Sequence, residues 1–250
     1  MKLLIDIGNT RLKLATQQGS TMQFVTAIAI KSIEQMQKDL RRTIETLDGS
    51  LDACVAVSVA STQVNQALQE LVTPLTVRWI RPGVKAAGVS NAYPDPSQLG
   101  ADRWVGMIGL TRHFVLPHPP IVLASFGTAT TVDTLSPANE FLGGLILPGV
   151  SLMHQVLANG TAQLPDAVGE LEAFPTNTIN AITSGITAAQ AGAVSRQIEL
   201  AHQTYGQQPI LCVTGGAWPS VAHEFARVLG TERAHELPHV VLDGLSVLAC

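Results

Sequence analysis

In the first third of the chain, the spacing of hydrophobic positions changes several times between strand-like and helix-like. Short apolar runs bounded by turn residues indicate strands, and apolar residues that recur every three to four positions indicate amphipathic helices. The predicted elements are strands at residues 2–7, 12–16, 22–27, 51–59 and 75–80, and helices at residues 31–47 and 62–72. The order of three strands, then helix, strand, helix and strand is typical of an α/β domain in which the first strand has antiparallel neighbours.

The second half of the chain repeats this opening. Residues 81–100 are rich in loop signals, a helix is expected at residues 102–113, and prolines interrupt the chain at residues 117–120. The elements predicted after this break are strands at residues 121–126, 129–135, 141–147, 210–213 and 240–242, and helices at residues 152–158, 179–205, 221–229 and from residue 243. We therefore expect two domains, at residues 1–117 and 118–250, each beginning with a strand and two antiparallel partners.

Composition narrows the classes of protein that this chain can represent. Its 250 residues are 46% hydrophobic and 14% charged, which predicts a chain that folds throughout. A net charge of −4 offers no electrostatic surface for nucleic acid or an anionic membrane. No apolar stretch approaches the ~20 residues of a membrane helix. The start of the chain lacks a secretory signal pattern, and the three cysteines lack metal-ligand spacing, so a cytoplasmic location is expected.

The residues with the clearest chemical meaning begin at the end of the first predicted strand. Asp6 is followed by a glycine turn and the hydroxyl of Thr10. A turn without a bulky side chain lets backbone N–H groups approach phosphate oxygens, and the carboxylate can hold an accompanying Mg²⁺ directly or through water. An ordinary hairpin turn has the same pattern, so this motif alone leaves both interpretations open.

Two further glycine turns favour the phosphate interpretation. Residues 126–133 (FGTATTVD) form a second turn of glycine and hydroxyl residues between two predicted strands, and residues 214–217 (TGGA) join a strand to a helix, where small residues permit close approach of an adenosine. Walker A and Rossmann glycine patterns are absent. Two such turns on duplicated units facing a central cleft can hold one polyphosphate from both sides, as in the actin, hexokinase and acetate kinase superfamily.

The chain resembles type III pantothenate kinase, the family that also contains the Bvg accessory factors. Six motifs carry the resemblance in the expected order: residues 6–10 (DIGNT), 93–103 (YPDPSQLGADR), 127–133 (GTATTVD), 143–149 (GGLILPG), 177–178 (NT) and 214–216 (TGG). The resemblance implies an α/β fold of two ribonuclease-H-like (actin-like ATPase) domains facing a central cleft. It also implies ATP-dependent phosphorylation of pantothenate to 4′-phosphopantothenate, the first step of coenzyme A biosynthesis.

The resemblance assigns roles to individual residues. Asp102 matches the catalytic base, which takes the proton of the acceptor hydroxyl. The matching substrate residues are Tyr93, Gly100, Ala101, Asp102, Arg103 and Thr178. The matching nucleotide residues are Asp6, Ile7, Gly8, Asn9, Thr10, Arg11, Leu12, Lys13, Gly127, Thr128, Gly215 and Gly216, with Asp6 organising Mg²⁺. Without the flanking motifs, Asp102 and Arg103 could equally be a helix-terminal acid beside a surface cation, and Thr178 could simply cap a helix.

Two features of the resemblance concern partners. The family threonine that matches Thr178 reaches pantothenate across a dimer interface, which implies a homodimer whose site lies at that interface. Family members usually carry an aspartate two residues before Gly127 that helps to bind a monovalent cation, but this chain has Ser125. A hydroxyl is a weaker K⁺ ligand than a carboxylate, so activation by K⁺ or NH₄⁺ is expected to be weak or absent.

Two other functions remain compatible with the residues. The chain could be an accessory or regulatory protein that keeps the scaffold but turns over slowly, which the Ser125 difference allows and the intact Gly-x-Asp-Arg motif disfavours. It could also be another acyl-phosphate or polyphosphate phosphotransferase of the same superfamily. Pantothenate-dependent release of ADP distinguishes these possibilities.

Overall fold

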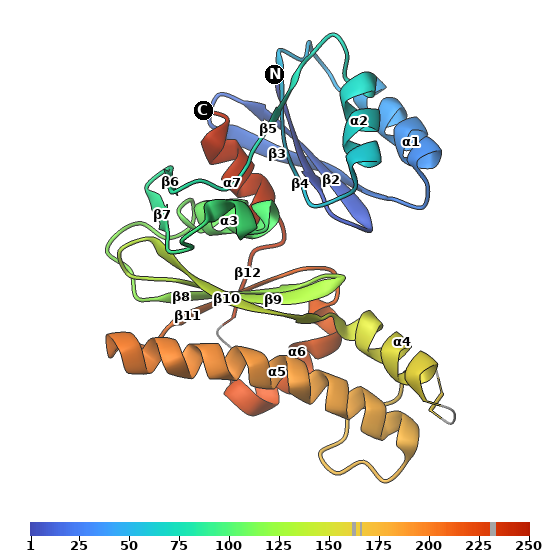
Figure 1. Ribbon diagram of the computed structural model, residues 1–250, viewed down its shortest axis with the longest axis vertical. Helices are drawn as coiled ribbons and strands as arrows, with labels where there is room; N and C mark the ends of the chain where they lie inside the picture. Colours follow the sequence, from blue (N-terminus) through green and yellow to red (C-terminus); the bar gives the residue numbers. More distant parts are fainter. Residues whose placement is uncertain (162–163, 166, 231–233) are drawn as a thin grey trace. The chain divides into compact units, whose positions relative to one another are not determined.

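A computed structural model describes residues 1–161, 164–165, 167–230 and 234–250. The chain forms two compact units (Figure 1). Unit 1 contains Met1–Leu116, Asn139–Phe141 and His239–Cys250, and unit 2 contains Pro117–Ala138 and Leu142–Pro238. A division after residue 117 leaves residues 139–141 and 239–250 in the second half, whereas both segments group with unit 1.

Unit 1 is built on a five-stranded sheet of order β3-β2-β1-β4-β5. Its strands are β1 (Lys2–Ile7), β2 (Arg11–Gln18), β3 (Thr21–Ala29), β4 (Ala53–Ser58) and β5 (Val77–Trp79). Strand β1 pairs antiparallel with β2 and parallel with β4, and β2 pairs antiparallel with β3. The sequence therefore predicted the opening three strands and their antiparallel pairing correctly.

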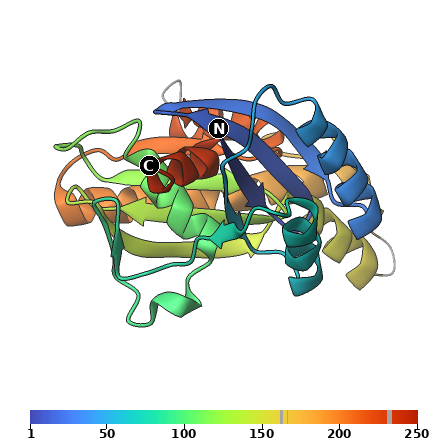
Figure 2. The same ribbon diagram turned by 90° about the horizontal axis from the view of Figure 1, so that it is seen from above.

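Helices cover the sheet of unit 1. Helices α1 (Ile33–Glu45) and α2 (Thr62–Leu71) begin at Ser32 and Ser61, whose side chains accept hydrogen bonds from backbone N–H groups of the first turn. They lie side by side in both views (Figures 1 and 2) and share a core with the odd-numbered residues of β1. Because side chains alternate across a strand, the even-numbered residues of β1, including Asp6, point to the other face.

Two helices that are distant in sequence also pack within unit 1. Helix α3 (Ala101–Leu110) contacts α7 (Val240–Leu248), and both contact β4. The backbones approach so closely that a Cβ atom on Gly109 would lie 1.9 Å from the carbonyl oxygen of Val240. A Cβ atom on Gly244 would lie 2.0 Å from the carbonyl oxygen of Val105. This close packing of glycines explains why the end of the chain belongs to unit 1.

The proline-rich loop before α3 contains short elements. They are β6 (Lys85–Ala86), β7 (Val89–Asn91) and the 3₁₀ turn η1 (Pro96–Gln98). Strand β7 pairs in parallel with Glu140 and Phe141 at the start of β10 (Glu140–Pro148). Such two- and three-residue strands carry no hydrophobic periodicity, and the sequence analysis described this segment only as loop.

Unit 2 is a second α/β arrangement, with strands in the order β12-β11-β8-β9-β10. The elements not yet named are β8 (Ile121–Phe126), β9 (Ala129–Leu135), β11 (Ile210–Thr214), β12 (His235–Glu236), α4 (Val150–Gly160), α5 (Thr178–Tyr205) and α6 (Trp218–Leu229). Strand β8 pairs antiparallel with β9 and parallel with β11. Apolar side chains of β8 and β9 pack against α5 and α6 in one core.

One predicted strand is wrong. The sequence analysis expected a strand at residues 240–242 and a helix from residue 243, but α7 already begins at Val240. Val240 and Leu242 are buried because α7 packs against α3 and the sheet, and a short helix turn of valine and leucine has the same apolar composition as a strand. No helix of the described residues is long and apolar enough to cross a membrane.

Candidate active site

Asp6 lies near the end of β1, where the strand meets the first glycine turn. It is 8% exposed and sits opposite Lys13 in the β1–β2 register. The Lys13 ammonium lies 4.0 Å from a carboxylate oxygen of Asp6. Burial raises the pKa of Asp6 from 3.8 to about 6; Lys13 opposes this shift and the charge of Asp102 adds to it. The site therefore holds a carboxylate that is costly to keep ionised unless a further cation approaches.

The turn after β1 is a tight hairpin. The N–H group of Gly8 donates to the carbonyl oxygen of Arg11 at 2.9 Å, and a Cβ atom on Gly8 would lie 3.3 Å from that oxygen. Asn9, Thr10 and Arg11 are exposed at the tip. The predicted nucleotide residues Ile7 and Leu12 are fully buried in the core. Their side chains therefore support the turn, and only their backbone atoms can face a ligand.

Asp102 occupies the first turn of α3, two residues after the N-cap residue Gly100. Its carboxylate accepts a hydrogen bond from the N–H group of Arg103 at 2.8 Å. A Cβ atom on Gly100 would lie only 2.9 Å from the same carboxylate oxygen, so a larger residue there would displace the acid. Burial raises the pKa of Asp102, while the Arg103 N–H group and guanidinium act in the opposite direction. Ala101 is half-buried beside it.

The two acids that come from separate motifs are close enough to interact. The charge of Asp102 raises the pKa of Asp6 although 96 positions separate them in the sequence. The even-numbered face of β1 and the N-terminus of α3 together bring them into one neighbourhood of unit 1. The structure thus joins the first glycine turn to the Gly-x-Asp-Arg motif.

Arg103 belongs to an aromatic cluster that the sequence analysis did not identify. Arg103 is 8% exposed, and its guanidinium donates to the Tyr93 hydroxyl at 3.2 Å and lies 5.6 Å from the centre of the Phe141 ring. The rings of Tyr93 and Phe141 are stacked with 5.9 Å between their centres. Phe141 lies far along the chain in β10, and no sequence signal connects it to Tyr93. The cluster positions the cation beside Asp102.

In unit 2, the second glycine turn joins β8 to β9. The N–H group of Gly127 donates to the carbonyl oxygen of Ala129 at 3.1 Å, and both Gly127 and Thr128 are exposed. The N–H group of Gly149 donates to the carbonyl oxygen of Thr128 at 3.0 Å. A Cβ atom on Gly149 would lie 2.3 Å from the carbonyl oxygen of Gly127. The turn is therefore exposed toward solvent but supported closely by the end of β10.

The third glycine segment lies against the same part of β8. Gly215 has a φ of +101°, and a Cβ atom there would lie 2.3 Å from the carbonyl oxygen of Phe126. That oxygen also accepts a hydrogen bond from the N–H group of Ala217 at 3.1 Å. Gly215 and Gly216 are thus next to the Gly127–Thr128 turn. Ser125 precedes the turn in β8, paired in register with Thr131 and Thr214.

Thr178 starts α5 in another part of unit 2. The helix is capped by Asn177, whose side chain accepts from the N–H group of Asn180 at 2.9 Å, so the alternative that Thr178 is the cap is wrong. Thr178 is exposed and borders an apolar groove of about 570 Å³. The groove is lined by Pro148, Met153, Val156, Leu157, Leu164, Thr178, Ala181, Ile182, Gly185, Ile186 and Ala189.

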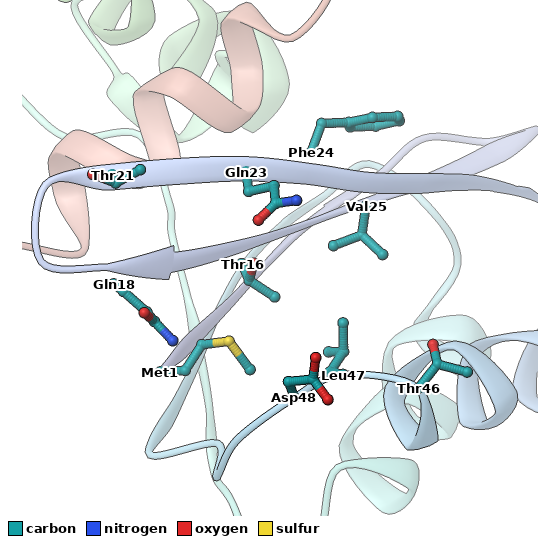
Figure 3. A pocket seen from close by; sticks show the side chains of 10 residues that line it. All are labelled: Met1, Thr16, Gln18, Thr21, Gln23, Phe24, Val25, Thr46, Leu47 and Asp48. Carbon is teal, nitrogen blue, oxygen red and sulfur yellow. The ribbon is translucent and has the colours of Figure 1, made fainter.

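A separate pocket, in unit 1, is lined by none of the predicted site residues. It has a volume of about 640 Å³ and lies between the ends of β2 and β3 and the segment after α1 (Figure 3). Thr16, Gln23 and Asp48 are among its lining residues, whereas Asp6 and Asp102 are not. Among the described residues no group of three or more histidine, cysteine, aspartate or glutamate side chains could hold a metal ion.

Comparison with known proteins identifies a family and close relatives that this chain resembles. Residues 2–200 match the family described as type III pantothenate kinase. The type III pantothenate kinase of Bordetella bronchiseptica is 42% identical over 260 residues, which cover 100% of this chain and 97% of that protein. The enzyme of the same name from Bordetella pertussis is also 42% identical, with the same coverage.

Solved structures support the fold. A Baf family transcriptional activator from Campylobacter jejuni aligns with a TM-score of 0.58 and 19% identity, over 99% of this chain and 97% of that one. An activator of 2-hydroxyisocaproyl-CoA dehydratase from Clostridium difficile, with bound ADPNP, aligns with a TM-score of 0.53 and 13% identity, over 99% and 93%. The expected α/β fold class is confirmed. Because the family match spans most of the sequence and the relatives cover its whole length, the chain belongs to the type III pantothenate kinase family.

Proposed function

We propose that this chain transfers the γ-phosphoryl group of ATP to the 4′-hydroxyl of pantothenate, giving 4′-phosphopantothenate and ADP. Membership of the family supports the reaction class, and relatives that share 42% of their residues carry the name of this activity. The single observation on which the proposal rests is the half-buried Asp102 carboxylate at the start of α3, beside Arg103 and within electrostatic reach of Asp6.

Asp102 is the proposed general base. A primary alcohol is a weak nucleophile at neutral pH, and a carboxylate in hydrogen-bond reach orients it and accepts its proton as the new O–P bond forms. The proton passes from the hydroxyl to a carboxylate oxygen of Asp102, and the bond between the γ-phosphorus and the bridging oxygen of ADP breaks. Burial raises the pKa of Asp102 and makes the carboxylate a stronger base than a solvated one.

Tyr93 and Arg103 are the proposed pantothenate-binding residues. The Arg103 guanidinium supplies several N–H donors in a fixed plane, which suits a carboxylate or phosphate oxygen. Its hydrogen bond to Tyr93 and its position over Phe141 restrict its rotation. Gly100 and Ala101 leave room for substrate beside the acid. The substrate would therefore meet a cation whose position is already set.

The residues around Asp6 fit the magnesium nucleotide that the reaction uses. Mg²⁺ is commonly bound by one or two carboxylates together with substrate phosphates, so a single buried acid suffices, and bound Mg²⁺ neutralises phosphate charge. Burial raises the pKa of Asp6, and the charge of Lys13 offsets this effect only in part. A second cation near the carboxylate would therefore be favourable. The exposed tip at Asn9–Arg11, Lys13, and the turns at Gly127–Thr128 and Gly215–Gly216 are the proposed phosphate and adenosine contacts.

A homodimer is the proposed assembly, with Thr178 of one subunit completing the pantothenate site of its partner. The groove beside Thr178 is apolar, and Val156 on its wall is 62% exposed. A second copy of this chain would cover these side chains and remove them from water, which favours association. Ile179, directly after Thr178 at the start of α5, is also exposed.

Monovalent cations are proposed to have little effect on this enzyme. Ser125 occupies a half-buried position in β8, two residues before the Gly127 turn. Its neutral hydroxyl offers a weaker ligand to K⁺ or NH₄⁺ than the aspartate that family members usually carry there. The contacts proposed for Thr128 do not depend on this position.

A coupled assay for ADP release tests the proposed function. ADP should form only when pantothenate is present, and mass spectrometry should identify phosphopantothenate as the product. Asp102→Asn should lower kcat by roughly 10²- to 10⁴-fold because the base is lost, while circular dichroism remains unchanged. Asp48→Asn, at an exposed acid outside the six family motifs, is the matched control and should retain activity. ADP release that is equal without pantothenate would overturn the substrate, and full activity of Asp102→Asn would overturn the base.

A further inference from the structure

Gln190 is a completely buried polar residue in the middle of α5. Its side chain is 0% exposed and lies on a helix that packs against β9 and α4. The amide nitrogen donates to the carbonyl oxygen of Pro148 at 3.0 Å and lies 3.4 Å from the sulfur of Met153. A buried amide group is costly unless it is hydrogen-bonded. The hydrogen bond to Pro148 therefore offsets part of the free-energy cost of burying the Gln190 amide.

The Pro148 carbonyl belongs to the same peptide group as the N–H of Gly149. That N–H donates to the carbonyl oxygen of Thr128 at 3.0 Å. A trans peptide is planar, and its C=O and N–H groups point in opposite directions. Gln190 on one side and Thr128 on the other thus hold one rigid plane. Fixing the direction of the Pro148 carbonyl also fixes the direction in which the Gly149 N–H points.

This peptide group has little freedom to move. A Cβ atom on Gly149 would lie 2.3 Å from the carbonyl oxygen of Gly127 and 2.6 Å from that of Thr128. The backbone of Gly149 is therefore packed directly against the second glycine turn. Any tilt of the peptide plane must shift this turn, because the two backbones are already in close contact.

The oxygen of the Gln190 amide indicates that packing alone does not explain the residue. Within the part of the chain that the structure describes, this buried oxygen has no hydrogen-bond partner. An apolar side chain of similar volume would avoid that cost, and exchanging a half-satisfied buried polar group for a hydrophobic one is often close to neutral for stability. The presence of an amide at this position is therefore explained by the hydrogen bond that its nitrogen donates to the Pro148 carbonyl.

We propose that Gln190 is a positioning residue for nucleotide binding, which acts through the Pro148–Gly149 peptide on the Gly127–Thr128 turn. The inference rests on the proposed kinase function, in which that turn contacts the phosphates of ATP. Gln190 acts indirectly in this proposal, because its amide nitrogen bonds the Pro148 carbonyl and not the turn itself. Its loss should weaken nucleotide binding and leave the pantothenate residues of unit 1 unaffected.

The first test replaces the amide by an apolar side chain of similar length. Gln190→Met should raise the KM for ATP and the Kd for ADPNP roughly fivefold, the usual effect of one hydrogen bond, while the KM for pantothenate and the melting temperature stay near those of the parent chain. Gln203→Met makes the same chemical change at an exposed position of the same helix and should alter none of these values. Equal changes in both KM values, or no change in Kd, would overturn the proposal.

A second variant tests the donated hydrogen bond directly. In Gln190→Glu the introduced carboxyl group can donate to the Pro148 carbonyl only when it is protonated. Complete burial at this position raises the pKa of a carboxyl group by several units, which keeps it largely protonated at pH 6. Calorimetric titration with ADPNP should therefore give near-parent affinity at pH 6 and weaker binding at pH 8.5, relative to the parent chain at each pH. The same pH response in variant and parent would contradict the proposal. Absence of ADPNP binding to the parent would overturn this inference with the nucleotide site, whereas ADPNP binding without pantothenate phosphorylation would overturn only the substrate assignment.

Discussion

The guanidinium of Arg103 donates a hydrogen bond to the hydroxyl of Tyr93 at 3.2 Å, so the proline-rich loop and helix α3 form one surface. Both residues also contact the buried ring of Phe141. A cation held in this way loses little conformational freedom when it binds an anion. The Tyr93 hydroxyl is therefore expected to contribute to pantothenate affinity through Arg103, besides any contact of its own.

Tyr93→Phe isolates that hydroxyl. The ring stacking on Phe141 remains, but one hydrogen bond to Arg103 is lost, so the KM for pantothenate should rise roughly fivefold with little change in kcat. Steady-state kinetics at saturating ATP measures both values. Tyr205→Phe, which alters the only other tyrosine of the sequence, is the control and should behave as the parent chain. A fall in kcat alone would indicate a role in the chemical step.

Asp6→Asn should make the protein more stable at neutral pH while removing its activity. The folded chain binds a proton at Asp6 with a pKa of about 6, above the 3.8 of a solvated aspartate. Between pH 3.8 and about 6, Asp6 is protonated more often in the folded chain than in the unfolded chain. The free energy of unfolding therefore falls as the pH rises through this interval. Asparagine removes that loss, which amounts to about 1–3 kcal/mol.

Urea denaturation with a metal chelator present measures this effect. The stability difference between Asp6→Asn and the parent chain should be largest at pH 7–8 and should vanish toward about pH 3, where Asp6 is protonated in both the folded and the unfolded chain. Asp48→Asn changes an exposed acid and should show no such pH dependence. A destabilised Asp6→Asn at pH 7–8 would mean that the salt bridge with Lys13 outweighs the cost of burial.

The positions of strands β8 and β9 followed directly from the sequence, because β8 is an apolar run, β9 is rich in β-branched threonine and valine, and both are bounded by glycine or proline turns. The pairing of Tyr93 with Phe141 and the packing of α7 against α3 could not be predicted. Both join segments that are distant in the chain, and the packing of α7 against α3 depends on close backbone approach at Gly109 and Gly244 rather than on periodicity. Local patterns thus gave the candidate residues, whereas the contacts that orient them come only from tertiary structure.

Ser125→Asp should create a response to monovalent cations. The parent enzyme is expected to have the same kcat/KM in potassium, ammonium and choline chloride at equal ionic strength. A carboxylate at position 125 would add a negatively charged oxygen ligand beside the second glycine turn, so activity should become higher in potassium than in choline. Ser125→Asn, which adds bulk and a neutral oxygen, is the matched control. Strong potassium dependence of the parent enzyme would contradict the role given to Ser125.

The proposed homodimer can be tested by mixing two inactive subunits. If Thr178 serves the partner's site, a heterodimer of Asp102→Asn and Thr178→Ala subunits contains one site with both substitutions and one site with neither. Equal mixing after reversible dissociation should then restore about a quarter of the parent activity in a symmetric dimer, measured below the KM for pantothenate. Val156→Lys puts a charge into the apolar groove beside Thr178, so it should prevent the recovery of activity. Light scattering of this variant should show mainly the monomer. Activity of the mixture equal to the sum of the separate variants would show that Thr178 does not act across an interface.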